Sequence, residues 1–168
     1  MSVVVRPATL MDLDGICAVM QANAEDPSLF QRPRAHIAAS IDDFVVAADE
    51  AGAIVGTAAL HRHRPDNAEI LAVSIAPSAQ GAGIGARVVE ACISRAGTTP
   101  WLWLSTAKPG YFARFGFVPI SMFSLPPGVL LEKLPLFFEQ TPARCLFAVT
   151  GGYTFMRKVP PVPGDGPG

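Results

Sequence analysis

The sequence has few charged residues and no excess of either sign. Its 168 residues include 13 Lys and Arg against 14 Asp and Glu, which gives a formal net charge of −1 at pH 7. Proteins that bind nucleic acid through bulk electrostatics need a clear positive excess, so we expect no nucleic-acid partner. Half of the residues are hydrophobic and only 16% are charged, a composition that argues against general disorder.

Long apolar runs and paired cysteines are also missing. No run approaches the roughly 20 apolar residues that span a membrane, and the opening stretch MSVVVRPATLMDLDG lacks the basic start and apolar block of a secretory signal. The cysteines, Cys17, Cys92 and Cys145, form no CxxC pair, so we expect reduced thiols. These absences predict a cytoplasmic protein without a membrane partner.

The length and the C-terminal composition predict one folded domain followed by a tail. A chain of this size can bury one proper core and hardly two. The stretch VPPVPGDGPG at the C-terminus has the Pro- and Gly-rich composition of a disordered end. We therefore expect a single domain over residues 1–158 and a disordered tail over residues 159–168.

Hydrophobic periodicity alternates between the patterns of helices and strands. Apolar residues at helical spacing predict helices over about 10–23 and 83–96, with short ones around 35–41 and before Gly116. Runs of apolar and β-branched residues predict strands, two of them joined into an antiparallel hairpin by the turn-rich RPDN. The expected strands lie near residues 3–5, 43–50, 53–63, 68–76 and 100–105, directly after Gly116, and near 144–150 and 153–158.

A glycine-rich turn separates a predicted strand from a predicted helix in SIAPSAQGAGIGARVVEACISRAG, residues 74–97. Glycines there allow positive φ and close approach to a ligand, and the helix N-terminus adds partial positive charge, so the turn favours a phosphate. A P-loop is excluded because no Lys-Ser/Thr pair follows. Gly81, Gly83 and Ala86 match the dinucleotide fingerprint literally, but that turn normally follows the first strand of a parallel unit, with an acidic residue about 20 positions later. Neither condition is met here.

The turn resembles a different signature. QGAGIG after VSIAP resembles the Q/R-x-x-G-x-G/A motif of the GNAT (Gcn5-related N-acetyltransferase) superfamily, with Gln80, Gly83 and Gly85 at the motif positions. YFARFGFVP resembles the LYxKxGF segment of the same family, about 30 residues further on. The resemblance covers about residues 3–150 and implies an α/β (α+β) GNAT fold. In that fold a mixed, mostly antiparallel sheet of about seven strands is splayed between the fourth and fifth strands and flanked by about four helices.

The resemblance also implies that acetyl-CoA, as co-substrate and without a metal, enters the gap between those strands. Backbone groups of the fourth strand would pair with the pantetheine arm, and the glycine turn would hold the pyrophosphate. The residues so implied are Val73, Ser74, Ile75, Gln80, Gly81, Ala82, Gly83, Ile84, Gly85 and Ala86, with Phe112 beside the thioester.

The reaction implied is direct attack of a neutral amine on the thioester, which needs positioning, oxyanion stabilisation and removal of an amine proton. We expect Glu69, at the start of the fourth strand, to be the base; a solvated strand-end glutamate is the alternative. The tyrosine that protonates the departing thiolate in the family aligns with Phe112. Tyr111, one position earlier, and Ser105, at the end of the fifth strand, are therefore the candidates for this step, with solvent as the alternative.

Residues 32–77 resemble a narrower group, the single-domain bacterial amino-acid N-acetyltransferases known as N-acetylglutamate synthases. This resemblance implies an amino acid as the acceptor of the acetyl group. Leu71 stands where that group has an arginine, which leaves Arg32, Arg34 and Arg144 as candidates to bind a substrate carboxylate, each with a plain surface charge as its alternative. Another amine (a polyamine, a drug or a protein N-terminus) and a non-catalytic acyl-CoA sensor remain open.

Two further stretches have no assigned role. HRHR at residues 61–64 predicts a solvated hairpin tip, or a positive rim for an anionic substrate or the CoA phosphates. As a metal site we judge it poor, because two imidazoles without a nearby carboxylate or thiol are too few ligands. The apolar VLLEKLPLFFEQ, residues 129–140, predicts either a homodimer contact or a cover over the pocket.

Overall fold

A computed structural model describes residues 2–26, 28–126, 128–129, 131–132 and 139–159. The strands of these residues form one seven-stranded sheet in the order β1-β2-β3-β4-β5-β7-β6, and every neighbouring pair is antiparallel except the parallel β4–β5. The predicted mixed sheet is thus confirmed. Its strands are β1 (Val3–Pro7), β2 (Phe44–Asp49), β3 (Ile54–Arg64), β4 (Asn67–Ile75), β5 (Trp101–Thr106), β6 (Phe117–Ile120) and β7 (Thr154–Lys158).

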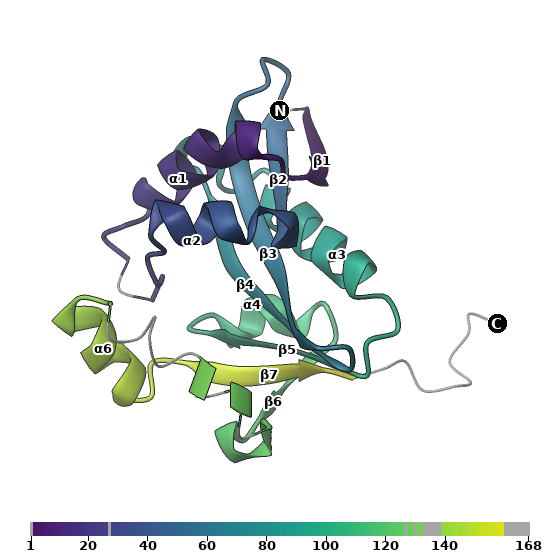
Figure 1. Ribbon diagram of the computed structural model, residues 1–168, viewed down its shortest axis with the longest axis vertical. Coiled ribbons are helices and arrows are strands. Elements are labelled where there is room, and N and C mark those ends of the chain that lie inside the picture. Colours follow the sequence, from purple (N-terminus) through teal and green to yellow (C-terminus); the bar gives the residue numbers. More distant parts are fainter. Residues whose placement is uncertain (1, 27, 127, 130, 133–138, 160–168) are drawn as a thin grey trace.

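Helices cover both faces of the sheet because the side chains of β2 alternate between two apolar clusters. Phe44 and Val46 pack in the cluster that contains α1 and α2, whereas Val45 and Ala47 pack in the cluster that contains α3. Figure 1 shows α1 and α2 lying together across the strands, apart from α3. The helices that lie wholly among the described residues include α1 (Leu13–Gln21), α2 (Arg34–Ala39), α3 (Ile84–Ala96), α4 (Pro109–Ala113) and α6 (Pro142–Val149).

Helix α3 follows the glycine turn as the sequence predicts. It begins after Gly83, whose φ of +76° is in the left-handed region, and ends before Gly97, whose φ is +59°. Ile84, Val88 and Cys92 are fully buried on its inner face, at the spacing of an amphipathic helix. The helix therefore presents its N-terminus beside the end of β4 while its inner face packs on the sheet.

The sheet splits between β4 and β5. The two strands pair only over Asn67–Glu69 and Trp101–Trp103, after which β4 continues along β3 and β5 continues along β7. Ala72 has a φ of +54°, and the register of β3 with β4 shifts between Thr57 and Ala59, so a β-bulge bends β4 where the gap opens. Figure 1 shows the two directions that the strands take: β5 and β7 cross the lower part of the molecule, while β2–β4 run along its length.

Several expectations need correction or remain outside the described residues. The predicted strand RCLFAVT is helix α6, because Pro142 at its first turn and the helix-forming Ala, Arg and Leu that follow favour a helix over the strand that its apolar run suggested. The predicted tail lies outside the described residues except for Val159, as do Leu130 and residues 133–138 of the apolar stretch. Among the described helices, none is both long and apolar enough to cross a membrane.

Candidate active site

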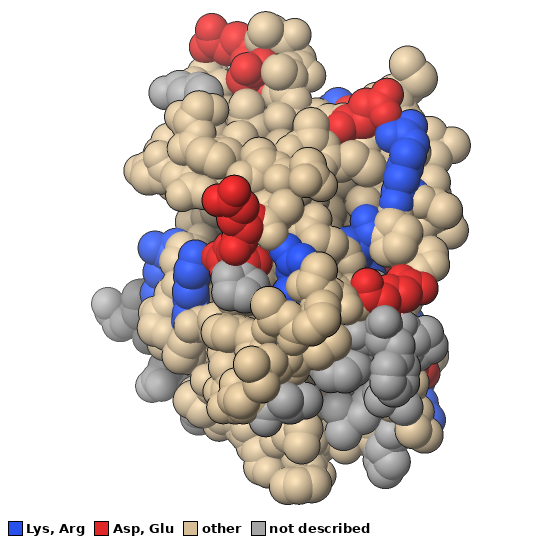
Figure 2. Space-filling view, turned by 90° about the vertical axis from the view of Figure 1, so that its left-hand side faces the viewer, with Lys and Arg blue, Asp and Glu red and all other residues tan. Residues whose placement is uncertain are grey.

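A cavity of about 1620 Å³ follows the gap between β4 and β5. It is larger than the roughly 300–1,000 Å³ of usual small-molecule sites, which leaves room for an extended ligand and a second molecule. Its lining runs from the glycine turn, along the end of β4, to the start of β4 and the hairpin end of β3. Figure 2 shows a largely uncharged face on this side of the molecule, where Lys and Arg lie beside Asp and Glu across its middle.

The glycine turn forms one end of this cavity. Gly81 and Gly83 have φ values of +79° and +76°, with open space where a Cβ would stand. A Cβ at Gly85 would lie 2.7 Å from the hydroxyl oxygen of Tyr111, so only glycine fits there without movement of that side chain. Ten of the eleven residues predicted to hold CoA line the cavity, and Ala82 does not. The ten are Val73, Ser74, Ile75, Gln80, Gly81, Gly83, Ile84, Gly85, Ala86 and Phe112.

Asn23, just after α1, ties the turn to the end of β4. Its amide Nδ2 donates to the Ser74 hydroxyl and to the carbonyl of Ile75, both at 3.0 Å. Its Oδ1 accepts from the Gln80 side chain at 3.3 Å. No motif in the sequence marks Asn23 for this role, because its only local signal is a polar amide directly behind an amphipathic helix.

At the other end of the cavity, Glu69 and His63 form a buried pair. Glu69 is 1% exposed, and the imidazole Nε2 of His63 lies 3.2 Å from its Oε2. The His63 side chain is 3% exposed and stacks on Trp103, with ring centroids 5.8 Å apart and an interplanar angle of 21°. The Glu69 side chain is therefore enclosed rather than solvated, and the alternative of a solvated strand end is wrong.

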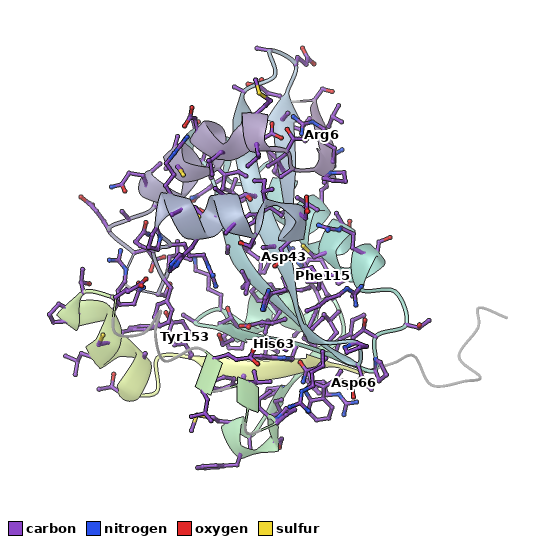
Figure 3. All side chains as sticks on the ribbon, in the orientation of Figure 1. Arg6, Asp43, His63, Asp66, Phe115 and Tyr153 are labelled. Carbon is purple, nitrogen blue, oxygen red and sulfur yellow. The ribbon has the colours of Figure 1, made fainter. Side chains whose placement is uncertain are left out.

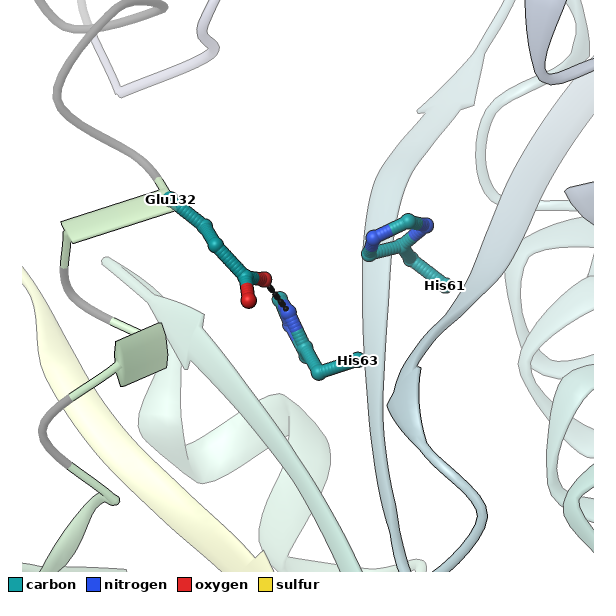
Figure 4. A group of neighbouring side chains, drawn as sticks. All are labelled: His61, His63 and Glu132. Carbon is teal, nitrogen blue, oxygen red and sulfur yellow. Dashed lines mark hydrogen bonds and ion pairs between the residues drawn. The ribbon is translucent and has the colours of Figure 1, made fainter.

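A second carboxylate holds the other side of His63. Nδ1 of His63 lies 2.6 Å from Oε2 of Glu132, whose side chain is 53% exposed. Figure 4 shows Glu132 reaching across to the imidazole from a separate segment of the chain. Burial lowers the pKa of His63, but the hydrogen bonds with Glu69 and Glu132 outweigh it, so the net pKa is raised above the ordinary value.

The predicted solvated hairpin tip for HRHR is wrong for His63, whose side chain is enclosed. The argument that a metal site there would lack nearby carboxylates is also wrong. Carboxylates are near, since Nδ1 of His61 lies 2.8 Å from Oδ2 of Asp43 and Glu132 contacts His63. His61, His63 and Glu132 each offer one donor atom within 4.8 Å of the others. However, both nitrogens of His63 and Nδ1 of His61 already have carboxylate partners, so we interpret the group as hydrogen-bonded side chains.

Tyr111 and Ser105 both line the cavity. Tyr111 is on α4 and places its hydroxyl beside Gly85 at the start of α3, and the Arg114 guanidinium stands 4.0 Å from its ring centroid. Phe112 is buried and meets the Tyr111 ring edge to face at 5.0 Å. The two aromatic residues thus divide, with Phe112 in the core and Tyr111 reaching the glycine turn.

The three candidate arginines have different surroundings. Arg32 lines the cavity and is half-buried; burial lowers its pKa, while the charges of Glu69 and Asp43 act in the opposite direction. Arg34 lies outside the cavity lining, is exposed and pairs with Asp14.

Arg144 has a structural role on helix α6, whereas the sequence predicted a strand near residues 144–150. It is 7% exposed on helix α6, and its Nε donates to the carbonyl of Leu29 at 2.9 Å while Nη2 donates to that of Ala24. The guanidinium therefore holds the loop after α1. Leu71, which replaces the arginine of the narrower family, lines the cavity and packs against the α1–α2 cluster.

Tyr153, which no sequence motif singles out, forms part of the cavity wall near α6. Its hydroxyl donates to the carbonyl of Ser28 at 2.9 Å, and burial raises the pKa of the phenol to about 12. Phe30 and Phe147 meet its ring edge to face at 5.6 and 5.2 Å. Figure 3 places Tyr153 toward α6 and His63 nearer the crossing of β3 with β7.

Comparisons with known sequences agree on one domain type. Residues 40–119 match the acetyltransferase (GNAT) domain family. The chain is similar to an amino-acid acetyltransferase of Ralstonia nicotianae, with 32% identity over 125 residues that make up 72% of this chain and 28% of that protein. A second amino-acid acetyltransferase, from Aeromonas salmonicida, is 30% identical over 125 residues. The chain thus spans about 28% of the length of these curated relatives.

Solved structures show the same fold. N-acetylglutamate synthase from Neisseria gonorrhoeae, complexed with coenzyme A and N-acetyl-glutamate, superposes with a TM-score of 0.74 at 23% identity, over 94% of this chain and 35% of that one. Rv2747 from Mycobacterium tuberculosis, in complex with CoA, gives a TM-score of 0.73 at 24% identity, over 94% of this chain and 99% of that one. At these identities the likeness concerns the fold, which agrees with the predicted sheet splayed between β4 and β5.

Proposed function

Residues 40–119 form an acetyltransferase domain of the GNAT family, and from this premise we propose that the chain transfers an acetyl group from acetyl-CoA to the amine of an amino acid. The observation that carries the proposal is one cavity that joins a glycine turn at a helix N-terminus to a buried carboxylate, Glu69. The names of the two curated relatives and the N-acetyl-glutamate bound to the Neisseria synthase support an amino-acid acceptor.

Acetyl-CoA occupies the half of the cavity between the glycine turn and the end of β4. The pyrophosphate lies against Gly81, Gly83 and the N-terminus of α3, where backbone N–H groups and the helix dipole favour negative charge. The pantetheine arm follows the unpaired edge of β4 over residues 73–75, because β4 leaves β5 after Glu69 and its edge then faces the cavity. The acetyl group thereby points toward Glu69.

Glu69 is the base that takes a proton from the substrate ammonium, directly or through a water molecule. Its position is fixed by β4 pairing with both β3 and β5 at this residue, where it stands opposite His61 and Trp103. Tyr111 and Ser105 line the same cavity and remain the two candidates to protonate the CoA thiolate.

Arg32 is the residue we assign to the substrate carboxylate. Its guanidinium is half-buried, lines the cavity and lies close enough to Glu69 and Asp43 for their charges to act on its pKa. A charge-assisted hydrogen bond to a carboxylate contributes about 1.5–3 kcal/mol. Arg32 thus takes the role of the arginine that the narrower family has at the position of Leu71. Arg34 and Arg144 have other partners.

Three expectations about the whole protein accompany the proposed reaction, and they concern its location, its domain extent and its oligomeric state. We place the protein in the cytoplasm, because its three cysteines form no CxxC pair. We expect residues 1–158 to behave as one domain. We also expect a homodimer that covers exposed apolar side chains such as Phe123 and Leu131, which are 87% and 66% exposed. Equilibrium ultracentrifugation at micromolar concentration tests the last expectation.

The proposal is tested by measuring CoA release from acetyl-CoA with a panel of amino acids, polyamines and amine drugs, together with acetyl-CoA binding by calorimetry. Turnover of an acidic amino acid is the expected result. An absence of acetyl-CoA binding overturns the proposal. Binding without turnover of any amine overturns the enzymatic part and favours an acyl-CoA sensor, while turnover of a polyamine alone overturns the amino-acid acceptor.

A further inference from the structure

His63 connects the buried end of the cavity to the protein surface. Its Nε2 is 3.2 Å from Glu69, which is 1% exposed, and its Nδ1 is 2.6 Å from Glu132, which is 53% exposed. The imidazole itself is 3% exposed and lies flat on Trp103. The three side chains thus form a continuous line of hydrogen bonds from the interior to solvent, built from β3, β4 and the segment after residue 128.

A buried base needs such a line for two reasons. An ionised carboxylate without solvent is costly unless a cation or hydrogen-bond donors compensate it. A carboxylate that accepts a proton in each turnover must also lose that proton before the next one. Imidazole serves both needs, because its protonated form is a cation and its two nitrogens can gain and lose protons on opposite sides of the ring.

We propose that His63 is a positioning residue that acts through Glu69: it holds Glu69 as a carboxylate toward the amine and releases a proton to solvent through Glu132. The proposal rests on the role of Glu69 in the proposed function. It goes beyond that function because it assigns a task to a histidine on β3 and to a glutamate that lies 63 positions after Glu69 in the chain.

The proton transfers balance. The N–H bond of the substrate ammonium breaks as an O–H bond forms on Glu69, and the Nδ1–H bond of the His63 imidazolium breaks as an O–H bond forms on Glu132. Glu132 then exchanges its proton with water. A carboxylate–imidazolium pair becomes a carboxylic acid beside a neutral imidazole, so the buried pair carries no net charge before or after the transfers. The cycle closes once the product has left: the O–H bond of Glu69 breaks as water entering the cavity takes that proton, and an Nδ1–H bond forms again on His63 with a proton that Glu132 returns from water.

Other charged and titratable groups near His63 are already accounted for. His61, from the same strand, meets it edge to face with ring centroids 4.8 Å apart and has Asp43 as its own partner. Trp103 covers the ring from β5. Arg32 acts on Glu69 and Asp43 through its charge. Glu69 and Glu132 are thus the described carboxylates in hydrogen-bond contact with the imidazole.

The first test is His63→Gln, which keeps an N–H donor toward Glu69 and removes both the positive charge and the transfer through the ring. We expect kcat to fall at least about tenfold. Without the cation beside it, the carboxylate of Glu69 is more easily protonated, so the acidic limb of the kcat/KM profile moves to higher pH. Acetyl-CoA affinity, measured by calorimetry, stays unchanged. An unaltered pH profile and kcat in His63→Gln overturn the proposal.

Glu132→Gln tests the surface end of the line, with Glu90→Gln on the exposed side of α3 as the matched control. We expect a smaller loss of kcat that added formate or imidazole restores, because a diffusible base replaces the missing carboxylate. The control keeps full activity. Equal kcat in Glu132→Gln and wild type, without any effect of added base, overturns the role of Glu132.

A measurement without turnover keeps the inference separate from the proposed function. Nitrogen-15 spectra of histidine-labelled protein at neutral pH are expected to show His63 as an imidazolium in the wild type and as neutral imidazole in Glu69→Gln. A neutral His63 in the wild type overturns the inference even if the enzyme is active. If His63 is charged and no amine is acetylated, the proposed function fails while the pairing with Glu69 stands.

Discussion

The two ends of the cavity are built in opposite ways. The glycine turn comes from consecutive residues, 80–86, and its shape follows from left-handed backbone at Gly81 and Gly83. The other end joins Glu69, His63 and Glu132, which come from separate segments and meet only when the sheet closes. A site that depends on backbone conformation can be recognised from a few consecutive residues, whereas a site that depends on side-chain contacts requires residues that are far apart in the sequence.

Chemistry divides in the same way. Backbone N–H groups at a helix N-terminus can bind any phosphate of suitable shape, so the turn supplies affinity for a cofactor shared by many enzymes. A buried carboxylate between an imidazole and a cavity is suited to proton transfer on one reacting group. Variants at the two ends should therefore separate binding of acetyl-CoA from turnover.

Glu69→Gln is the change with the largest expected effect and the most direct way to break this comparison. The amide keeps the size of the side chain and removes its basicity, so kcat should fall by about 10²–10⁴-fold. Acetyl-CoA affinity should stay within about twofold, since the pyrophosphate lies at the other end of the cavity. Stopped-flow detection of CoA release and calorimetry measure the two quantities.

Glu90→Gln on α3 again provides the matched control, because this glutamate is exposed and lies outside the cavity lining. Full activity in the control assigns the loss to Glu69. If Glu69→Gln weakened acetyl-CoA binding as much as turnover, the two ends would not be separate and the comparison would fail.

How much could be predicted follows the same division. The sheet, α3 and the glycine turn were predicted, because hydrophobic periodicity and glycine placement act over a few residues. Residues 144–150 were assigned to a strand on their apolar run, although Pro142 marks a helix start. The burial of His63 was missed because it depends on Trp103 and Glu132, which lie far away in the chain.

Arg32→Ala tests whether the acceptor end also recognises the substrate. Loss of a charge-assisted hydrogen bond of about 1.5–3 kcal/mol should raise the KM for an acidic amino acid by roughly 10–150-fold. The KM for acetyl-CoA should not change. Steady-state kinetics with each substrate varied in turn distinguish the two effects.

Arg34 is the matched control, since it lies two residues away, is exposed and pairs with Asp14 outside the cavity lining. Arg34→Ala should leave both KM values unchanged. An equal rise of KM in both variants would mean that the substrate senses the general positive charge of this segment and not the Arg32 guanidinium.

Gly85→Ala sharpens the comparison from the side of the turn. The new Cβ would meet the Tyr111 hydroxyl at 2.7 Å, so Tyr111 must move and acetyl-CoA affinity should fall by up to about tenfold, within the usual cost of overpacking. Tyr111→Phe removes the obstructing oxygen. The double variant should therefore bind acetyl-CoA more tightly than Gly85→Ala alone in calorimetric titrations.

The same set of variants also tests which residue protonates the CoA thiolate. If Tyr111→Phe alone binds acetyl-CoA normally but loses kcat, Tyr111 protonates the thiolate and Ser105 does not. Equal kcat in Tyr111→Phe and wild type removes Tyr111 from the candidates. A double variant no better than Gly85→Ala would show that the glycine is needed for a reason other than the contact with Tyr111.

The smallest expected effect lies outside both ends of the cavity, at Asp12. Hydrogen bonds from Arg6, at 2.7 Å to each carboxylate oxygen, lower the pKa of Asp12 to about 2. Because the folded pKa is lower than the unfolded value, the pair stabilises the protein above about pH 4, and this contribution is lost as the pH falls toward 2. Arg6 is 40% exposed, so solvent screening reduces the contribution to about 1 kcal/mol.

Asp12→Asn should therefore lower the free energy of unfolding by about that amount at pH 7 and flatten its decline between pH 4 and 2, measured by urea titration at each pH. Acetyl-CoA affinity and kcat at pH 7 should match those of the wild type. The capping contacts of Asp12 fix only the chain that leads into α1. A loss of activity in Asp12→Asn would therefore mean that a change at the start of α1 reaches the glycine turn through Asn23. The structure of the cavity would then depend on α1 as well as on its two separately built ends.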